Sequence, residues 1–392
     1  MLERLEALHR IRSPGWIAFA GLVALAVAMG IGRFAFTPIL PMMQEDVGVS
    51  IAEGGWLASA NYAGYLFGAL SVMRLRGLGT VTAIRGGLVA IGILTLAVGF
   101  ESQFVVWIVL RFLAGVASAW VMILVSAWCL ERLASLGRPL LTGTVFAGVG
   151  TGIAAAGGVC IVIAHSHGSS AQAWITLGVL SLVLSAVVWP SFSEDAGSRS
   201  ETAKLPTTGS AHWDAESIRL VLCYGAFGFG YIIPATFLPV MAKQVIHNPG
   251  LFGWSWPIFG LAAVASTLVV AALSRNAGNR SLWIISHLVM ALGVVFPVVL
   301  PGLGAIVVAA LFIGGTVIVV AMLAMQEARN VAGHDAPRLM AAMTSAFAIG
   351  QMVGPIAVSY TVGVDGDFSG ALLGACFLLL ASACVLALGR KP

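Results

Sequence analysis

Apolar runs of about 20 residues or more follow one another along almost the whole chain, separated by short clusters of charged and turn residues. A helix that crosses the hydrocarbon core of a bilayer needs about 20 mainly apolar residues. Only 9% of the residues are charged and 59% are hydrophobic, whereas a soluble domain carries roughly 25% charged residues. The sequence therefore excludes a soluble globular fold and predicts repeated membrane-spanning helices.

These runs predict an all-α integral membrane protein with twelve transmembrane helices. The expected spans are residues 15–41, 53–73, 80–100, 103–131, 139–164, 171–190, 216–242, 251–273, 281–300, 304–327, 338–362 and 368–389. Because the number of spans is even, both termini are expected on the same side of the membrane. The lipid bilayer is the first partner that the sequence implies.

The basic residues orient the spans, because Lys and Arg close to helix ends are retained on the cytoplasmic side. With a cytoplasmic N-terminus, Lys243 alone of the 20 Lys and Arg residues falls in an outer loop, and Arg33 and Arg111 fall within spans. We therefore expect a multi-pass protein of the bacterial inner membrane with both termini in the cytoplasm. The net charge of +4 is spread over many inner segments, which argues against a nucleic-acid partner.

The two halves of the chain carry a common pattern in their first spans. Gly30–Met43 matches Gly228–Met241 at a constant offset of 198 residues, and Gly55-Trp56 matches Gly253-Trp254 at the same offset. Six spans separate the two copies, so the copies share their orientation in the membrane. Parallel repeats of this kind are typical of transporters built from duplicated bundles.

The longest polar stretch separates the two copies. It is rich in Ser, Thr, Gly and charged residues and cannot bury enough apolar surface to fold alone. We therefore expect an N-terminal six-helix bundle over residues 1–190, a cytoplasmic linker over 191–215 and a C-terminal six-helix bundle over 216–392.

Twelve spans in two parallel sets of six, joined by a long polar loop, resemble the major facilitator superfamily (MFS). Within it, the segment Gly30–Leu70 is similar to the signature of the YbfB/YjiJ-type branch. Arg111–Gly115 resembles the arginine motif of the fourth helix, and Glu131 with Arg138 resembles the loop that follows it. The resemblance implies alternating access, with a substrate bound near the middle of the membrane between two pseudo-symmetric bundles.

Arg33 and Arg111 are the charged residues expected inside spans, at a similar depth and without a deep Asp or Glu to neutralise them. A charge in the hydrocarbon region is costly and marks a functional site by default. Arginine can bind a carboxylate or phosphate through two parallel hydrogen bonds. We therefore expect a small organic anion as the substrate. The alternative is that an arginine bonds to carbonyls of a broken helix around Pro38 and Pro41, or reaches outward.

Further candidate binding residues share helix faces at comparable depth. They are Asn61, Tyr62 and Tyr65 in the second span, Tyr224, Phe227 and Tyr231 in the seventh, and Gln351 in the eleventh. Their polar atoms and rings suit a ligand, but packing or bonding between helices is the alternative.

Two acidic residues at repeat-related helix ends are candidate gate residues. Glu131 could pair with Arg138, and Glu327 with Arg338, to close the inner side. Solvated interfacial charge is the alternative. A proton is a candidate coupling ion, but His287 is the only clear histidine within a span and a weak candidate to carry it.

The predicted function is secondary transport by a monomer, without a cofactor or metal. The five cysteines lie in apolar runs without metal-ligand spacing, and no nucleophile–base constellation indicates an enzyme. One alternative is a proton-coupled exporter of drugs or other lipophilic compounds. Another is a membrane sensor or assembly partner on the same scaffold.

Overall fold

The computed structural model describes residues 13–72, 79–192, 214–246, 252–273, 278–300, 302–362 and 366–388. All regular structure in these ranges is helical, as predicted. The predicted linker, residues 191–215, falls almost entirely outside the described residues. The boundaries of the two halves therefore stay a prediction.

Each predicted span corresponds to one helical segment in the described part of the chain. The first half contains α2 (Pro14–Leu25), a π-helix (Ala26–Ile31), α3 (Phe36–Asp46), α4 (Ile51–Ser71), α5 (Thr80–Val98), α6 (Phe104–Ser135), α7 (Thr142–His165) and α8 (Ser170–Val188). The second half contains α9 (Ala215–Val245), α11 (Ser255–Leu273), α12 (Asn279–Val299), α13 (Leu303–Ala332), α14 (Ala336–Thr361) and α15 (Ser369–Ala387). The first segment consists of three elements, α2, the π-helix and α3, which together form the first span.

Ten of the twelve segments are long and apolar enough to cross a membrane. The other two, α4 and α11, are 21 and 19 residues long. The predicted fold class of twelve transmembrane helices is confirmed.

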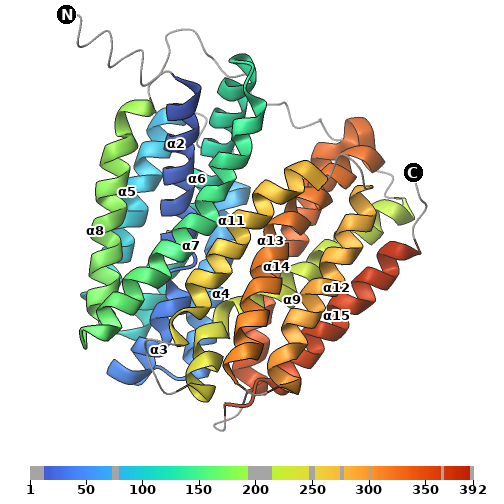
Figure 1. Cartoon of the computed structure of the whole chain (residues 1–392). Helices are drawn as coiled ribbons and strands as arrows, with labels where there is room; N and C mark the ends of the chain where they lie inside the picture. The colour runs from blue at the N-terminus through green and yellow to red at the C-terminus, as the bar shows by residue number, and fades with distance from the viewer. Residues whose placement is uncertain are drawn as a thin grey trace, which may run out of the picture.

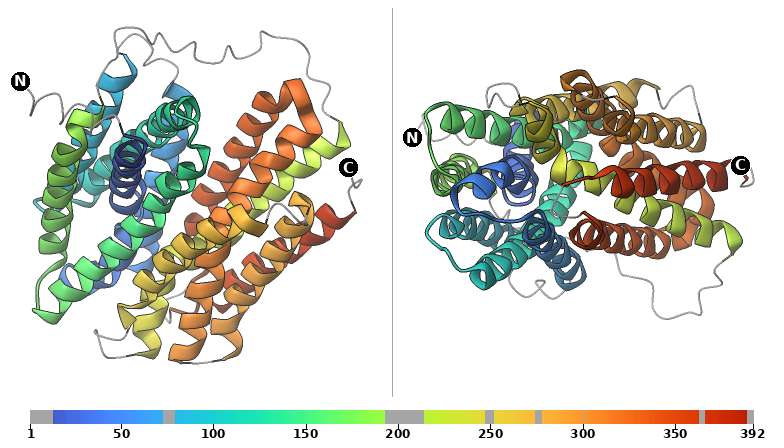
Figure 2. Two further views of the ribbon diagram at one scale, coloured as in Figure 1. Left: turned by 45° about the horizontal axis from the view of Figure 1, so that its top comes forward. Right: turned by 90° about the horizontal axis from the view of Figure 1, so that it is seen from below.

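Helices α2–α8 and helices α9–α15 form two groups that lie side by side (Figure 1). The start of α2 and the end of α15 lie at the same end, which we call the termini end; the opposite end, where α3 and α9 finish and α4 begins, is the far end. The two groups lean together at the far end and draw apart toward the termini end (Figures 1 and 2).

Glycines allow the helices of one group to approach each other closely. A Cβ added to Gly64 of α4 would lie 1.9 Å from the Phe112 carbonyl oxygen of α6, and one on Gly148 of α7 would lie 2.1 Å from the Leu22 carbonyl oxygen. In the second half, a Cβ added to Gly228 of α9 would lie 2.3 Å from the Phe347 carbonyl oxygen of α14. Small residues at such crossings are typical of membrane helices.

The first span is broken, although the sequence predicts one continuous helix. Gly32 and Phe34 donate their backbone N–H groups five residues back, to the carbonyl oxygens of Val27 at 2.9 Å and Met29 at 3.0 Å. A turn over residues 32–35 follows before α3 begins. Pro38 contributes to the break because it has no N–H to donate to Phe34.

Replacing Gly64 with alanine is expected to destabilise the first half. The added Cβ would overlap the backbone of α6, and overpacking typically costs about 1–3 kcal/mol, so the thermal unfolding temperature in detergent should fall by several degrees. Gly86→Ala in α5 is the matched control, since a Cβ there has no neighbour within 4 Å. Equal unfolding temperatures for the two variants would contradict the expected overlap.

Candidate functional site

Arg33 lies at the break in the first span, and its side chain reaches across to the other half. The residue is 2% exposed. Its Nη2 donates a hydrogen bond to Oε1 of Gln351 in α14, and Nε2 of Gln351 donates to the hydroxyl of Tyr231 in α9. The structure thus joins three of the predicted binding residues in one chain of hydrogen bonds between the two halves.

Aromatic rings surround the Arg33 guanidinium. Its Cζ lies 3.9 Å from the centre of the Tyr65 ring and 5.2 Å from the centres of the Tyr62 and Phe34 rings. The Tyr62 hydroxyl lies 3.1 Å from Oγ1 of Thr236 in the opposite half. Ring faces attract a cation, so they stabilise part of the Arg33 charge. They do not accept conventional hydrogen bonds from the guanidinium N–H groups.

Arg111 is equally buried but contacts backbone instead of side-chain acceptors. Its Nη1 donates to the Gly32 carbonyl oxygen at 3.3 Å and its Nη2 to the Arg33 carbonyl oxygen at 3.0 Å. Nδ2 of Asn61 donates to the Gly32 and Arg111 carbonyl oxygens at 3.3 and 2.9 Å. Arg111 and Asn61 therefore hold the broken segment that carries Arg33, through the Gly32 and Arg33 carbonyl oxygens instead of carbonyls around Pro38 and Pro41.

The site carries more positive charge and donors than the described residues neutralise. In the ranges that the structure describes, no Asp or Glu oxygen lies within 4.0 Å of either guanidinium. The Nε atoms of both arginines and Oδ1 of Asn61 are buried without a hydrogen-bond partner there. A ligand with a carboxylate or phosphate group would balance this charge.

The predicted aromatic residues of α9 form a stack on the second-half side of the site. Phe347 of α14 contacts all three, with ring centroids 4.9 Å from Tyr224, 5.2 Å from Phe227 and 5.7 Å from Tyr231. Sequence reasoning missed Phe347, although it lies one helical turn before Gln351. Phe227 also stacks on His287, with centroids 5.9 Å apart.

His287 lies inside the second half, away from the interface with the first. It is fully buried, and its Nε2 accepts a hydrogen bond from Nε1 of Trp283 at 3.0 Å. The residue packs in the core of the second half, against Phe227 and against Trp283, which contacts Tyr224.

Repeat-related residues face each other along the seam between α3 and α9. Oγ1 of Thr37 donates to the carbonyl oxygen of Ala235 at 3.2 Å, and Nζ of Lys243 lies 2.6 Å from Oε1 of Glu45. Each pair is related by the offset of 198 residues, and so are Arg33 and Tyr231. The pseudo-twofold axis of the repeat therefore passes along this seam.

Hydrogen bonds between α4 and α14 close the far end beside the seam. Oγ of Ser59 donates to the Met352 carbonyl oxygen and Oγ of Ser359 to the Ala52 carbonyl oxygen, both at 2.9 Å. These two bonds, which we call the far-end seal, lie between the Arg33 site and the far end. The structure is therefore of a state in which this site is closed toward the far end.

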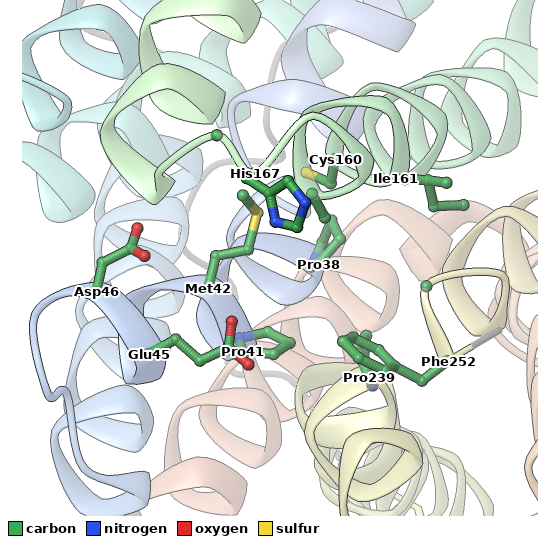
Figure 3. Close-up of a pocket in the computed structure, with 14 residues that line it drawn as sticks. Pro38, Pro41, Met42, Glu45, Asp46, Cys160, Ile161, His167, Pro239 and Phe252 are labelled. Carbon is green, nitrogen blue, oxygen red and sulfur yellow. The ribbon is translucent and has the colours of Figure 1, made fainter. Parts of the chain in front are cut away.

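A pocket of about 250 Å³ lies at the far end, lined by residues of α3, α7 and α9 and of the segments just after α7 and just before α11 (Figure 3). Pro41 and Pro239 lie next to each other at its base, with Met42 and His167 on the side of the first half. Its acidic residues are engaged elsewhere, because Glu45 pairs with Lys243 and Asp46 accepts a hydrogen bond from the Ser170 N–H.

The candidate gate residues lie near the termini end. Glu131 and Arg138 are exposed. Glu327 is 2% exposed, with its Oε1 3.1 Å from Nε of Arg280, while Nη1 of Arg338 lies 3.7 Å from Oδ1 of Asp335. Pairing of Glu131 with Arg138 and of Glu327 with Arg338 stays a prediction.

A charged cluster links the helices of the second half at the termini end. Glu216 accepts hydrogen bonds from Arg219 and Arg280, and Arg280 also contacts Glu327. These residues come from α9, α12 and α13. Sequence reasoning did not single out Glu216 or Arg280.

Comparison with known proteins identifies relatives of the whole architecture. The family model of the "Uncharacterised MFS-type transporter YbfB" matches residues 25–387. The uncharacterized MFS-type transporter YceJ of Bacillus subtilis (strain 168) is 30% identical over 107 residues, which is 27% of this chain and 26% of that protein. The match thus spans about a quarter of that relative.

A solved structure shares the fold across nearly the whole chain. The crystal structure of a mutant of the nucleoside transporter NupG superposes with a TM-score of 0.77 at 11% sequence identity. The superposition covers 95% of this chain and 99% of the other. At this identity the likeness concerns the fold alone.

The two arginines are expected to differ in their contribution to stability. Arg111→Met leaves the Arg33 carbonyl oxygen without its side-chain donor and the Gly32 carbonyl oxygen with Asn61 alone, at about 1–3 kcal/mol for a buried group left unsatisfied, so the unfolding temperature in detergent should fall by several degrees. Arg33→Met removes a buried charge and should change it little. Equal destabilisation by the two variants would show that Arg111 does not hold the break.

Proposed function

The chain belongs to the family of the uncharacterised MFS-type transporter YbfB, and on that premise we propose that it transports a small organic anion by alternating access. We place it in the bacterial inner membrane, with both termini cytoplasmic. The coarser function, membrane transport of a small molecule, is that of the family.

The observation that carries the proposal is the environment of Arg33. Its guanidinium is buried at the interface of the two halves and contacts an amide oxygen and aromatic rings, but no carboxylate of the described residues. A buried charge is stable only when it is paired and hydrogen-bonded. An anionic substrate provides that pairing during part of a transport cycle.

Both halves contribute residues to the proposed binding site. Arg33 and Tyr65 present positive charge and a ring face from the first half, while Gln351 and Tyr231 present polar groups from the second. Arg111 and Asn61 fix the backbone that carries Arg33. A substrate held between these surfaces contacts both halves, so its binding energy can drive the halves together.

Alternating access then follows from the seam between α3 and α9. In this state the far end is closed by the Thr37 and Ser59 hydrogen bonds between the halves, so the substrate exchanges with the termini end. Breaking these bonds and closing the termini end exposes Arg33 to the far end. Tyr62, Tyr224 and Phe227 line the aromatic side of the proposed path.

A second candidate substrate class is a planar neutral solute. The stack of Tyr224, Phe227, Tyr231 and Phe347 suits ring-shaped ligands, and NupG is named as a nucleoside transporter. The same stack would serve an exporter of lipophilic compounds. The unneutralised charge on Arg33 favours the anion, because a neutral ring leaves that charge unpaired.

The proposal predicts that purified protein in proteoliposomes takes up a carboxylate. Radiolabelled lactate, succinate and benzoate form the anion panel and uridine the neutral arm, each with and without an imposed pH gradient to test proton coupling. Arg33→Lys should reduce anion uptake at least tenfold, because a lysine has no planar fork for a carboxylate. The protein should retain wild-type expression and unfolding temperature.

Arg85→Lys is the matched control, since Arg85 contacts only one residue of the same half, Trp189, among the contacts described. Nη2 of Arg85 donates to the Trp189 carbonyl oxygen at 3.0 Å, and the Arg85 guanidinium lies over the Trp189 ring. This variant should transport as the wild type does. Uptake of uridine with no uptake of the three anions would refute the anion proposal, and so would wild-type anion uptake by Arg33→Lys.

A further inference from the structure

The acceptor position on Arg33 is occupied by a side chain of the protein itself. A guanidinium has donors only, so the Gln351 atom that faces it is the amide oxygen. The amide nitrogen then points to the Tyr231 hydroxyl, which fixes the orientation of the side chain. Gln351 thus presents an oriented oxygen to Arg33, as one oxygen of a carboxylate would.

This contact forms between the halves. Arg33 belongs to the first span and Gln351 to α14, 318 residues later. It lies at the inner edge of the far-end seal, just inside the Ser59–Met352 hydrogen bond. The contact therefore depends on closure of the far end, and closure in turn buries Arg33.

We propose that Gln351 is an internal stand-in for the substrate carboxylate, which lets the empty protein close its far end and reorient. The inference rests on the proposed function, because it takes Arg33 to be the anion-binding residue. Its consequence is a mode of transport: the protein moves its anion in one net direction and is not limited to exchanging one anion for another.

The loaded and the empty protein differ in the group that accepts a hydrogen bond from Arg33. In the loaded protein the substrate neutralises Arg33 during closure, and its full charge lets it displace the uncharged amide. If Gln351 were absent, closure of the empty protein would bury the Arg33 charge without a hydrogen-bond acceptor, which is strongly unfavourable. The Gln351 oxygen supplies that acceptor, so the empty protein also closes.

The first test measures the conformation of the empty protein and needs no substrate. Spin labels at Phe100→Cys and Val299→Cys, which are 70% and 65% exposed at the far ends of the two halves, report its opening by pulsed electron–electron distance measurement in nanodiscs. The five native cysteines are replaced beforehand. Gln351→Met, which keeps the volume but removes the acceptor, should lower the closed-to-open ratio about tenfold.

Two further variants distinguish the hydrogen-bond acceptor for Arg33 from the general effect of losing one hydrogen bond between the halves. Ser59→Ala removes a neighbouring bond between α4 and α14 without touching Arg33, and should shift the ratio less than about threefold. The double variant Arg33→Met/Gln351→Met should close as the wild type does, because the guanidinium that needs the Gln351 oxygen is gone. A shift in Gln351→Met no larger than that in Ser59→Ala, or a double variant that stays open, would overturn the proposal.

The second test compares two fluxes of whichever of lactate, succinate or benzoate the wild type takes up. Gln351→Met should lower the ratio of net uptake to exchange against internal unlabelled anion about tenfold, because only the empty protein uses the Gln351 oxygen to close. Equal loss of both fluxes would refute the stand-in role but leave the anion proposal intact. If the wild type takes up none of the three anions, the anion proposal fails, and the distance measurement alone decides whether the Gln351 oxygen serves as the acceptor that Arg33 needs for closure.

Discussion

The interaction on which the site depends is the capping of the broken first span by Arg111 and Asn61. A break in a helix frees backbone carbonyls, and in a membrane each of them must find a donor within the protein. Arg111 and Asn61 donate to the Gly32 and Arg33 carbonyl oxygens. These hydrogen bonds hold the backbone at residues 32 and 33 where the Arg33 side chain contacts Gln351 and the ring of Tyr65. The two buried arginines therefore have linked roles, since one holds the backbone that aims the other.

The seam between the halves shows how a duplicated scaffold becomes an asymmetric binding surface. Thr37 and Glu45 on α3 meet their own repeat partners on α9, so the same backbone face is used twice. The chemistry at the repeat-related positions differs, with Glu45 opposite Lys243 at the exposed end and Arg33 near Tyr231 at the buried end. The exposed ion pair contributes at most about 1 kcal/mol. The buried polar contacts therefore dominate the closure of the far end.

The sequence predicted the twelve spans well because each depends on local composition. It also singled out Arg33, Tyr231 and Gln351, since each is a polar or charged residue at membrane depth. It did not predict that these three are bonded together, because contacts between residues more than 100 positions apart depend on how the helices pack. Phe347 was missed for a related reason, since an aromatic residue in an apolar run has no local signal that distinguishes a binding surface from core packing.

The break in the first span has a cause that the repeat makes visible. The glycine pair Gly30 and Gly32 has its counterpart in Gly228 and Gly230, yet α9 runs unbroken from Ala215 to Val245 despite Pro234 and Pro239. The shared glycines and Pro41 therefore do not decide that a helix breaks, whereas Pro38 has no proline counterpart, because Thr236 stands at the offset of 198 residues. The halves differ in the donors, because the position of Asn61 corresponds to Phe259 at the offset of 198 residues, and the region of α13 that corresponds to Arg111 is apolar, residues 305–313. In a membrane the carbonyls of a broken helix need donors within the protein, so Pro38 together with Arg111 and Asn61 accounts for both the break and its restriction to the first half.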